Sequence, residues 1–362
     1  MPSNPGRSAV VVGAASVRRP RFPVLSSLRH RDFTYLWLST FFASTGQWFQ
    51  QITVGWLVWL LSESPLLVGT VTGMRALPFL LLSPLAGVLA DRMDRRRLLM
   101  VTQGVLFGVT LLFAVDVVLE TVQVWHAFLF VLITGAGWAF NQPARQALVA
   151  NTVPRHDLMN AVALQSLAFY VTRAIGPAAG GLLIVFIGMA GNFLIQAVTY
   201  LGVLLMLLPV RAPYKEADTT ARAQSMWANL VEGMRYVAGQ PALLGLIAMS
   251  FIPPVVLMGA IQQLPVFADR VFHRGADALG YLLSAHGVGA MVGGVAVALL
   301  GGVRGKGRLA IAMLAASTVL LLLFGLSRWL WLSLALLGLA GVFQMTFRIL
   351  NHTLVQMIVP DK

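Results

Sequence analysis

The chain has 362 residues, of which 58% are hydrophobic and 11% are charged, and its mean hydropathy is +0.79. Soluble globular proteins carry about 25% charged residues, so this composition excludes an ordinary soluble enzyme, and its apolar content excludes intrinsic disorder. The absence of cysteine excludes disulfides and thiolate metal sites. A net charge of +13 would suggest nucleic acid in a soluble protein. Here it raises the question of which side of a membrane the basic residues face.

Ten apolar stretches are long enough to cross a bilayer, for which about 20 mostly apolar residues are needed. In chain order they are expected near residues 33–60, 66–90, 98–118, 125–144, 161–187, 191–210, 241–267, 278–300, 309–326 and 329–350. This succession of apolar runs predicts an all-α integral membrane protein with about ten transmembrane helices, whose first partner is the lipid bilayer.

The segment before the first stretch, residues 1–31, holds six arginines and no acidic residue. Arginines follow its apolar run Val10–Val12 where a signal peptide would need a small-residue cleavage site. We therefore expect an uncleaved, disordered, basic cytoplasmic tail. With this end inside, the inner segments hold twenty Lys and Arg residues and the outer loops three. The positive-inside rule then predicts a cytoplasmic N-terminus, and the charge needs no nucleic-acid partner.

The long polar connection at residues 211–240 separates the sixth stretch from the seventh. Its later part, which includes Met226, Trp227, Leu230 and Met234, has helical spacing. This spacing indicates an amphipathic helix on the membrane surface, and a soluble loop helix fits it equally well. In either case the segment is predicted to be a cytoplasmic linker between two halves of the chain.

Two segments of the chain recur. Gly135–Pro154 matches Gly341–Pro360 at an offset of 206 residues, and Ala90–Leu98 matches Gly301–Leu309 more weakly at an offset of 211. Chance similarity between apolar helices is common, but both pairs lie in inner connections of the same rank. The matches therefore predict a duplicated six-helix unit.

The two repeats are expected at residues 32–210, with six helices, and at residues 241–362, an incomplete copy with four. Two further helices follow the Val-Pro pair of the first copy, whereas two residues follow that of the second. This indicates a 12-helix plan that stops at ten, through natural truncation, a frameshift or an incomplete sequence. A truncated membrane protein that does not transport, a decayed carrier or a sensor, is therefore the alternative to an active carrier.

The connection between the second and third stretches contains GVLADRMDRR, residues 87–96. Helical spacing puts Gly87 and Asp91 on one face, where a glycine permits close helix packing. The run resembles the major facilitator superfamily signature G-x-x-x-D-R/K-x-G-R/K-R/K and departs from it at Asp94, where glycine is usual. A solvated loop anchor is the alternative. The resemblance implies an inner gate formed by Gly87, Asp91, Arg92, Arg95, Arg96 and Arg145.

A second motif lies in the fifth stretch, where Pro177 stands among glycines. Proline removes an intrahelical hydrogen bond and bends a helix, and glycines four residues apart let another helix pack closely. The run G-P-x-x-G-G resembles the antiporter motif of drug/proton exporters, although Thr172 stands where the longer motif has glycine. A structural kink is the alternative reading. The antiporter-like residues are Arg173, Gly176, Pro177, Gly180 and Gly181.

Further segments narrow the resemblance. They are Leu28–Phe33, Asn141–Val149, Val153-Pro154 and Asn160–Leu164. Together they resemble the transmembrane secretion effector subgroup, which includes the bacterial enterobactin exporter. The resemblance implies a major facilitator fold of two six-helix repeats in the cell membrane of a bacterium. It also implies a monomer that exports small amphiphilic molecules, such as siderophores, drugs or antibiotics, by alternating access coupled to protons.

Polar residues within the apolar stretches are candidates for the transport pathway, because charged groups are costly in hydrocarbon. Arg75 and Arg173 are such candidates, with structural ties to helix-end carbonyls as the alternative. Arg348 either faces the cavity or extends to the cytoplasm. Helices 1, 4, 7 and 10 line the cavity in the superfamily, which implies substrate contacts for their amides, with interhelical hydrogen bonds as the alternative. Trp56 and Trp59 are assigned to an outer aromatic belt with Trp48. The candidate cavity residues are Gln47, Gln51, Arg75, Gln165, Gln262 and Gln344.

Other mechanisms find little support in the sequence. No Asp or Glu is expected in mid-membrane, and packing is preferred to proton relay for the deep histidine His286, so proton coupling is expected from the resemblance alone. The run Gly301–Gly307 lacks the spacing and the Ser or Thr of an ATP-binding P-loop. Hydrolase motifs and metal-ligand spacings are absent from the sequence. We therefore predict a protein that is not an enzyme and uses no metal or cofactor.

Overall fold

The computed structural model describes residues 23–213, 235, 239–252, 258–300 and 305–358, and all regular secondary structure within them is helical. In chain order the elements are η1 (Pro23–Arg29), α1 (Arg31–Ser62), α2 (Pro65–Met74), α3 (Ala76–Arg92), α4 (Arg95–Val118), α5 (Val124–Thr152), η2 (Arg155–Asp157), α6 (Leu158–Leu207), α8 (Pro241–Ile252), α9 (Met258–Gln262), α10 (Leu264–Val266), the π-helix η4 (Phe267–Val271), α11 (Ala276–Leu300), α12 (Lys306–Leu326) and α13 (Leu330–Ile358).

Seven helical segments of the described residues are long and apolar enough to cross a membrane. They are Pro65–Gly87, Arg95–Val118, Val124–Thr152, Arg155–Leu207, Ala276–Leu299, Lys306–Leu326 and Leu330–Met357. The prediction of an all-α, multi-pass membrane protein is thereby confirmed, while the number of ten spans stays a prediction. Residues 1–22 of the expected cytoplasmic tail and most of the linker lie outside the described residues. The prediction of disorder is wrong for the end of the tail, where Pro23–Arg29 forms η1 and Arg31 begins α1.

The segment α6 contains two of the predicted stretches, because the chain turns back within it at Gly188. This residue has φ 74° and ψ 175°, a conformation that glycine adopts without the steric penalty of a Cβ atom. The side chain of Asn192 donates a hydrogen bond to the carbonyl of Gly180 at 3.2 Å. In a straight helix these residues would lie about 18 Å apart along the axis, so the halves of α6 form a tight hairpin.

Two other predicted stretches are interrupted. The stretch expected at residues 66–90 is divided into α2 and α3, which meet at Arg75. The stretch expected at residues 241–267 is described as the short helices α8, α9 and α10 and the π-helix η4. Single-turn π-helices frequently occur at functional sites, so η4 directs attention to the region around it.

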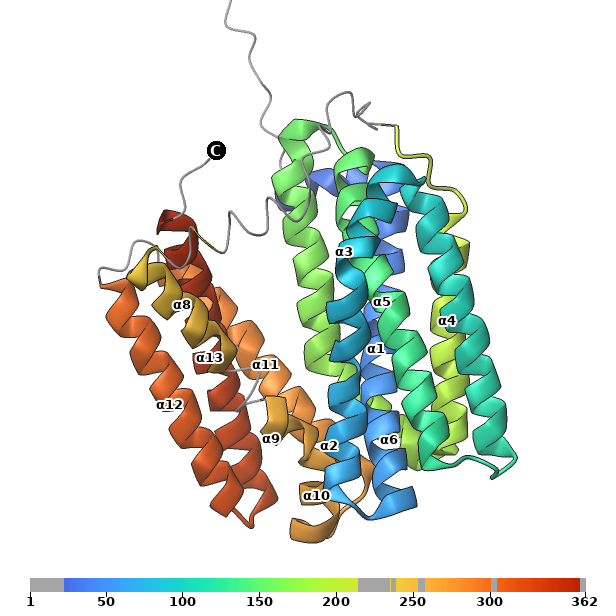
Figure 1. The fold of residues 1–362 in the computed structure, drawn as a ribbon, viewed down its shortest axis with the longest axis vertical. Helices are drawn as coiled ribbons and strands as arrows, with labels where there is room; N and C mark the ends of the chain where they lie inside the picture. The colour runs from blue at the N-terminus through green and yellow to red at the C-terminus, as the bar shows by residue number, and fades with distance from the viewer. Residues whose placement is uncertain (1–22, 214–234, 236–238, 253–257, 301–304, 359–362) are drawn as a thin grey trace, which may run out of the picture.

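The helices form two lobes that diverge toward the upper end of the view in Figure 1. In the first lobe α6 packs along α1 and α4, and α5 packs along α3 and α4. In the second lobe α13 packs between α11 and α12. The main connection across the lobes is between α6 and α11. We call the upper end, where Arg95 and Arg96 begin α4, the basic face, and the end that bears Glu63 and Asp269 the opposite face.

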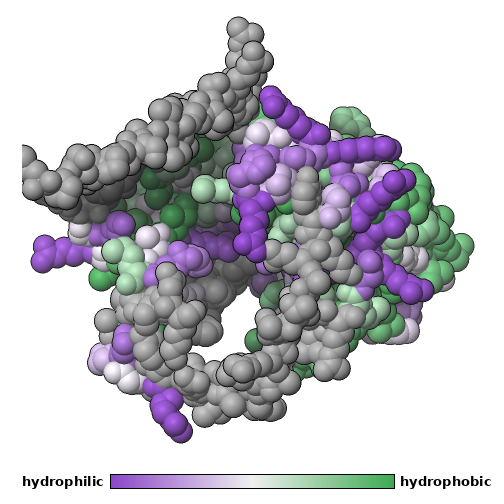
Figure 2. Space-filling view, turned by 90° about the horizontal axis from the view of Figure 1, so that it is seen from above, coloured by the Kyte–Doolittle hydropathy of each residue, from purple (hydrophilic) through white to green (hydrophobic). Residues whose placement is uncertain are grey.

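The buried cores explain why the lobes diverge. One hydrophobic core near the opposite face contains residues of both lobes, among them Leu57, Phe193 and Leu282. Toward the basic face each lobe has a core of its own, around Leu148 in the first and Phe347 in the second. Shared apolar burial therefore holds the lobes together at one end only. Viewed from the basic face, Figure 2 shows hydrophilic residues over the first lobe.

Many large apolar side chains face outward on the flanks of the bundle. Leu112, Phe186, Leu299, Leu322 and Trp331 are exposed by 66 to 82%. Exposure on this scale is unusual for a soluble protein and matches the surface that lipid covers in a membrane. Trp56 and Trp59, however, are only 7% and 1% exposed, so their assignment to an outer aromatic belt is wrong.

The helix α5 extends to Thr152, so its predicted end near residue 144 is too early and Arg145 lies within the helix, not in a loop. Its buried guanidinium donates hydrogen bonds to the hydroxyls of Ser39 and Thr40 on α1, at 2.8 and 2.7 Å. In the second lobe Asn351 of α13 donates to the hydroxyl of Ser250 on α8 at 2.6 Å. Asn351 is 206 residues after Arg145 and Ser250 is 211 after Ser39, the same two offsets as in the sequence matches. These contacts support the predicted repeat.

Candidate functional site

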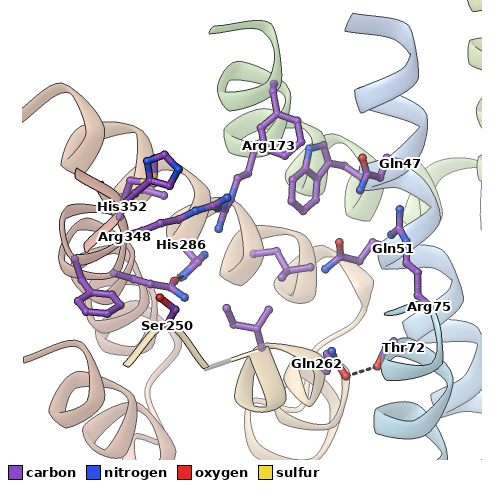
Figure 3. Close-up of a pocket in the computed structure, with 18 of the residues that line it drawn as sticks. Gln47, Gln51, Thr72, Arg75, Arg173, Ser250, Gln262, His286, Arg348 and His352 are labelled. Carbon is purple, nitrogen blue, oxygen red and sulfur yellow. Dashed lines mark hydrogen bonds between the residues drawn. The ribbon is translucent and has the colours of Figure 1, made fainter. Parts of the chain in front are cut away.

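A cavity of about 940 Å³ lies between the two lobes. Its walls come from α1, α5 and α6 of the first lobe and from α8, α11 and α13 of the second, with Thr72, Arg75, Ile261 and Gln262 near the opposite face. Figure 3 shows these side chains converging on one space. The polar lining residues are Gln47, Trp48, Gln50, Gln51, Thr72, Arg75, Arg173, Ser250, Gln262, His286, Gln344, Arg348, Asn351 and His352.

Five of the six predicted cavity residues line this space, namely Gln47, Gln51, Arg75, Gln262 and Gln344. Gln165 does not, although its amide atoms are buried on α6 without a hydrogen-bond partner among the described residues. The cavity also contains Trp48, which the sequence assigned to the aromatic belt. Thr72 donates a hydrogen bond to the amide oxygen of Gln262 at 2.8 Å, so this pair joins the two lobes at the floor of the cavity.

Arg75 lies where α2 gives way to α3, and its guanidinium is 5.8 Å from the ring of Trp138 on α5. The two helices approach closely there because Gly135 faces the backbone of Arg75. A Cβ atom at Gly135 would lie 2.9 Å from the Arg75 carbonyl oxygen. On the other side of the cavity, His286 of α11 lies 2.7 Å from the amide oxygen of Gln344 on α13, with Nε2 facing it.

Three arginines and two histidines line the cavity, whereas none of its described lining residues is Asp or Glu. The guanidinium of Arg173 is 6.0 Å from the ring of Trp48. Arg348 and His352, one helical turn apart on α13, face the cavity, as does His286. From the sequence, Arg348 is expected either in the cavity or at the cytoplasm, packing is expected for His286, and His352 is not predicted. The signal in the sequence was the spacing of Arg348 and His352, which puts both on one face of α13.

The cavity is closed at the opposite face by contacts between the lobes. Trp59 donates its indole N–H to Asp269 at 3.0 Å, and the guanidinium of Arg270 is 4.7 Å from the ring of Trp59. Arg270 also donates to the carbonyl oxygen of Glu63 at 3.3 Å. The side chain of Gln263 donates to the Pro65 carbonyl at 3.0 Å. A polar layer therefore separates the cavity from the opposite face.

The gate motif lies at the basic face of the first lobe. Arg95 donates to the side chain of Asn151 on α5 at 3.2 Å, and Arg96 donates to the carbonyls of Leu207 and Leu208 after α6. Asp94, the departure from the superfamily signature, accepts a hydrogen bond from the Arg97 N–H at 2.9 Å and caps α4. These contacts connect helices within one lobe. The side chains of Asp91 and Arg92 lie outside the described part, and a Cβ atom at Gly87 would meet open space.

The antiporter-like motif of α6 faces two neighbours. Gly176 and Gly180 face Trp48 and Phe49 of α1, where a Cβ atom would come within 2.9 and 3.1 Å of them. Gly181 and Pro177 face α11 of the other lobe, and a Cβ atom at Gly280 would lie 2.7 Å from the Pro177 carbonyl oxygen. The Ala178 N–H donates to the hydroxyl of Ser284 on α11 at 2.7 Å. The motif therefore brings backbone against backbone where the lobes meet.

Comparison with known proteins identifies the class to which this fold and cavity belong. The transmembrane secretion effector family of the major facilitator superfamily matches residues 23–362, and the chain belongs to this family. Its members are transporters and not enzymes, as the sequence predicted.

Two relatives have names that refer to siderophores. The chain is 25% identical over 264 residues to the staphyloferrin A transporter of Staphylococcus aureus, which covers 71% of the chain and 64% of the relative. It is 25% identical over 275 residues to the enterobactin exporter EntS of Shigella flexneri, with 76% and 64% covered. The chain thus spans less than two thirds of the length of these relatives.

Solved structures show the same fold. A bacterial homologue of the lysosomal transporter Spinster, in an inward-facing and unoccupied conformation, has a TM-score of 0.69 at 17% identity and covers 91% of the chain and 76% of that structure. A bacterial homologue of ferroportin in an inward-facing state has a TM-score of 0.66 at 14% identity, with 91% and 85% covered. The predicted major facilitator fold is confirmed by these similarities.

Proposed function

We propose that this chain forms a secondary active transporter that exports small amphiphilic molecules, such as siderophores, drugs or antibiotics, from a bacterial cell. The observation that carries the proposal is the cavity between the lobes, in which apolar side chains such as Val54 and Leu283 alternate with amides and basic groups. Sites for small organic ligands combine apolar walls with a few polar groups in this way. The siderophores in the names of the two relatives support the same class of cargo.

Transport would proceed by alternating access, in which the two lobes tilt about a cavity near the middle of the membrane. We infer that a single chain works as a monomer and that its basic face lies in the cytoplasm, because basic residues concentrate on the inner sides of membrane proteins. Opening of the other side would then break the contacts of Trp59 with Asp269 and Arg270.

The gate motif would hold the basic face closed in the second state. The residues proposed for this latch are Gly87, Asp91, Arg92, Arg95, Arg96 and Arg145. Asp91→Asn keeps the size of the side chain and removes its charge, and it is expected to reduce export while leaving membrane insertion intact. Export at the normal rate by this variant would eliminate the latch role.

We further propose that protons drive export. Candidate groups are His286 in the cavity and Asp269 in the polar layer that closes it. An ionophore that collapses the proton gradient is expected to stop export in proteoliposomes, whereas collapse of a sodium gradient is expected to leave it unchanged. Export that persists without a proton gradient would refute the coupling.

The experiment that tests the function compares the accumulation of siderophores and antibiotics in cells with and without the protein. Gln51→Trp places an indole in the cavity and is expected to abolish export of any compound that the wild type removes. Leu322→Trp, which adds the same group on the lipid-facing flank of α12, where Leu322 is 66% exposed, is the matched control. Equal accumulation with wild type and Gln51→Trp across the panel would refute the proposal.

A further inference from the structure

Four basic side chains gather at one wall of the cavity. We call Arg173, His286, Arg348 and His352 the basic cluster. Arg173 belongs to α6 of the first lobe, whereas the other three belong to α11 and α13 of the second. Figure 3 shows Arg173 and Arg348 extending toward one another from the two lobes, with His286 beside them.

Within the described part of the chain, no acidic side chain of the cavity lining balances the charges of this cluster. The positive charge of Arg348 acts unfavourably on that of Arg173, and Arg173 acts unfavourably on a positive charge at His286. Neither arginine has a carboxylate partner among the residues that the structure describes. Like charges near each other inside a membrane are costly, so this region favours a negatively charged group from elsewhere.

Hydrogen-bond donors without partners also lie at this wall of the cavity. Trp48 lies under Arg173, and its buried indole N–H has no partner among the described residues. No hydrogen bond from the guanidinium of Arg173 or Arg348 is found in the described part of the chain. A buried donor without an acceptor costs free energy, and an acceptor group placed between the two arginines would satisfy their guanidinium donors.

We propose that the basic cluster binds the carboxylate of an organic anion, held between Arg173 and Arg348. A planar carboxylate matches the two parallel N–H groups of a guanidinium, and His286 provides a further contact on the same wall. The proposal rests on the function proposed above and specifies its cargo as an anionic amphiphile.

The cavity argues for an organic anion and against a free inorganic ion. Beside the cluster it is lined by Phe169, Ile247, Leu283, Phe347 and Val355. These side chains offer an apolar surface that a body larger than phosphate can cover. Because the arginines belong to different lobes, the anion would draw the lobes together at the level of the cavity. The cargo would thus supply the negative charge that the described cavity lining lacks.

The test compares two probes that share a ring system and differ in charge, 2-naphthoate and 2-naphthamide. Binding to the protein in nanodiscs of zwitterionic lipid is measured by equilibrium dialysis, with empty nanodiscs subtracted. We expect the wild type to bind naphthoate about tenfold more tightly, the factor expected for one charge-assisted hydrogen bond. Inorganic phosphate at the same concentration should not displace naphthoate. Equal affinity for both probes, or displacement by phosphate, would overturn the inference.

Variants test whether the basic cluster causes the preference for naphthoate over naphthamide. Arg173→Gln and Arg348→Gln should each weaken naphthoate binding about tenfold and leave naphthamide binding unchanged. Arg348→Lys keeps the charge but loses the paired N–H groups of the guanidinium, so it should keep part of the preference for naphthoate. Arg308→Gln removes one positive charge from an exposed site outside the cavity and should change neither affinity. Loss of the preference in Arg308→Gln or in Arg348→Lys, or its persistence in both Gln variants, would contradict the proposal.

Flux across proteoliposomes separates this inference from the proposed function. If the protein prefers naphthoate in binding but moves no tested compound, the function fails and the anion site stands. If it exports naphthamide as fast as naphthoate and binds them equally, the export function stands and the anion site fails.

Discussion

His286 occupies in the second lobe the position that Arg75 occupies in the first. The two residues are 211 positions apart, and their partners Trp138 and Gln344 are 206 apart, the offsets of the two sequence matches. Arg75 lies 5.8 Å from the Trp138 ring, and His286 lies 2.7 Å from the Gln344 amide oxygen. Equivalent residues of the two repeats therefore face the cavity from opposite sides, as expected for a fold with internal two-fold symmetry.

The helices α11 and α13 approach closely beside His286, and this approach predicts that Gly341→Ala loses stability. A Cβ atom at Gly341 would collide with the carbonyl oxygen of His286 and lie 3.0 Å from the Ala290 nitrogen. Overpacking of this kind costs about 1–3 kcal/mol, so the Tm in detergent should fall by several degrees. Gly325→Ala on α12, where a Cβ atom meets open space, should keep or raise Tm. An unchanged Tm in Gly341→Ala would contradict the packing described for α11 and α13.

The polar layer at the opposite face predicts that Asp269→Ala opens the cavity on that side. The substitution removes the acceptor of the Trp59 indole N–H, a bond that joins the lobes. A lost hydrogen bond of about 1 kcal/mol changes a two-state population about fivefold. A membrane-impermeant maleimide added from that side should therefore label Gln51→Cys about fivefold faster in the Asp269→Ala background. The natural chain lacks cysteine, so no other site reacts.

Asp116→Ala is the control for this experiment. Asp116 lies at the same face but contacts His126 within the first lobe, at 2.6 Å. Its removal should leave the labelling rate unchanged. Equal acceleration by both substitutions would mean that the face loosens generally and that the Trp59–Asp269 contact has no special part in closure.

Arg145 and Asn351 make equivalent contacts in the two repeats, but we expect their substitution to affect Tm differently. Arg145→Met loses hydrogen bonds but also removes a buried charge that has no carboxylate partner among the described residues. Ser39 and Thr40 keep the bonds that they donate to the Leu36 carbonyl, at 2.7 and 3.0 Å. Because burial of an unpaired charge costs several kcal/mol, Tm should not fall.

Asn351→Ala changes no charge and removes two hydrogen bonds, one to Ser250 at 2.6 Å and one to the Leu246 carbonyl at 3.3 Å. At about 1 kcal/mol each, this loss should lower Tm by several degrees in detergent. A fall of similar size in Arg145→Met would show that its charge is solvated in the folded protein.

The docking of η1 onto η2 predicts a transition in acid. Hydrogen bonds from His30 and Ser26, the former the larger cause, hold the pKa of the Asp157 carboxyl below its ordinary value of 3.8. A depressed pKa means that the carboxylate favours docking above pH 3.8 and that this contribution disappears as the pH falls through the lowered pKa. The anisotropy of a dye on Leu25→Cys, a half-exposed position, should therefore drop only below pH 3.8.

Asp157→Asn should give the low anisotropy at every pH, because it cannot ionise. Asp277→Asn, at the start of α11, is the matched control and should behave like the wild type. A drop of anisotropy near neutral pH in the wild type would mean that another group governs the docking.

The sequence was sufficient for the fold class and for most of the cavity, since hydropathy reports which segments enter the membrane. It was insufficient wherever the outcome depends on rotation of a helix about its axis. Gln165 lies on the expected helix but outside the cavity, whereas His286 and Arg348 face into it. Neighbouring helices determine such rotations, and their close approach follows from backbone contacts that a linear pattern does not contain.

Secondary structure boundaries failed for a related reason. The predicted end of α5 followed the loss of hydrophobicity near Arg145. The helix continues because that side chain finds hydroxyl acceptors on α1, a tertiary contact that compensates for its polarity. Trp59 was likewise assigned to the lipid interface by type, yet its indole N–H is satisfied inside the protein by Asp269.

The contact between α6 and α11 determines how the lobes can move. Along it Gly280 faces the backbone of Pro177, and one hydrogen bond joins Ala178 to Ser284. Interlocking side chains would resist sliding, because each would have to leave its rotamer well. A contact made mainly by backbone has no such barrier, so it would serve as the axis about which the two lobes rotate. A larger side chain introduced at this contact would therefore hinder rotation toward either face of the membrane.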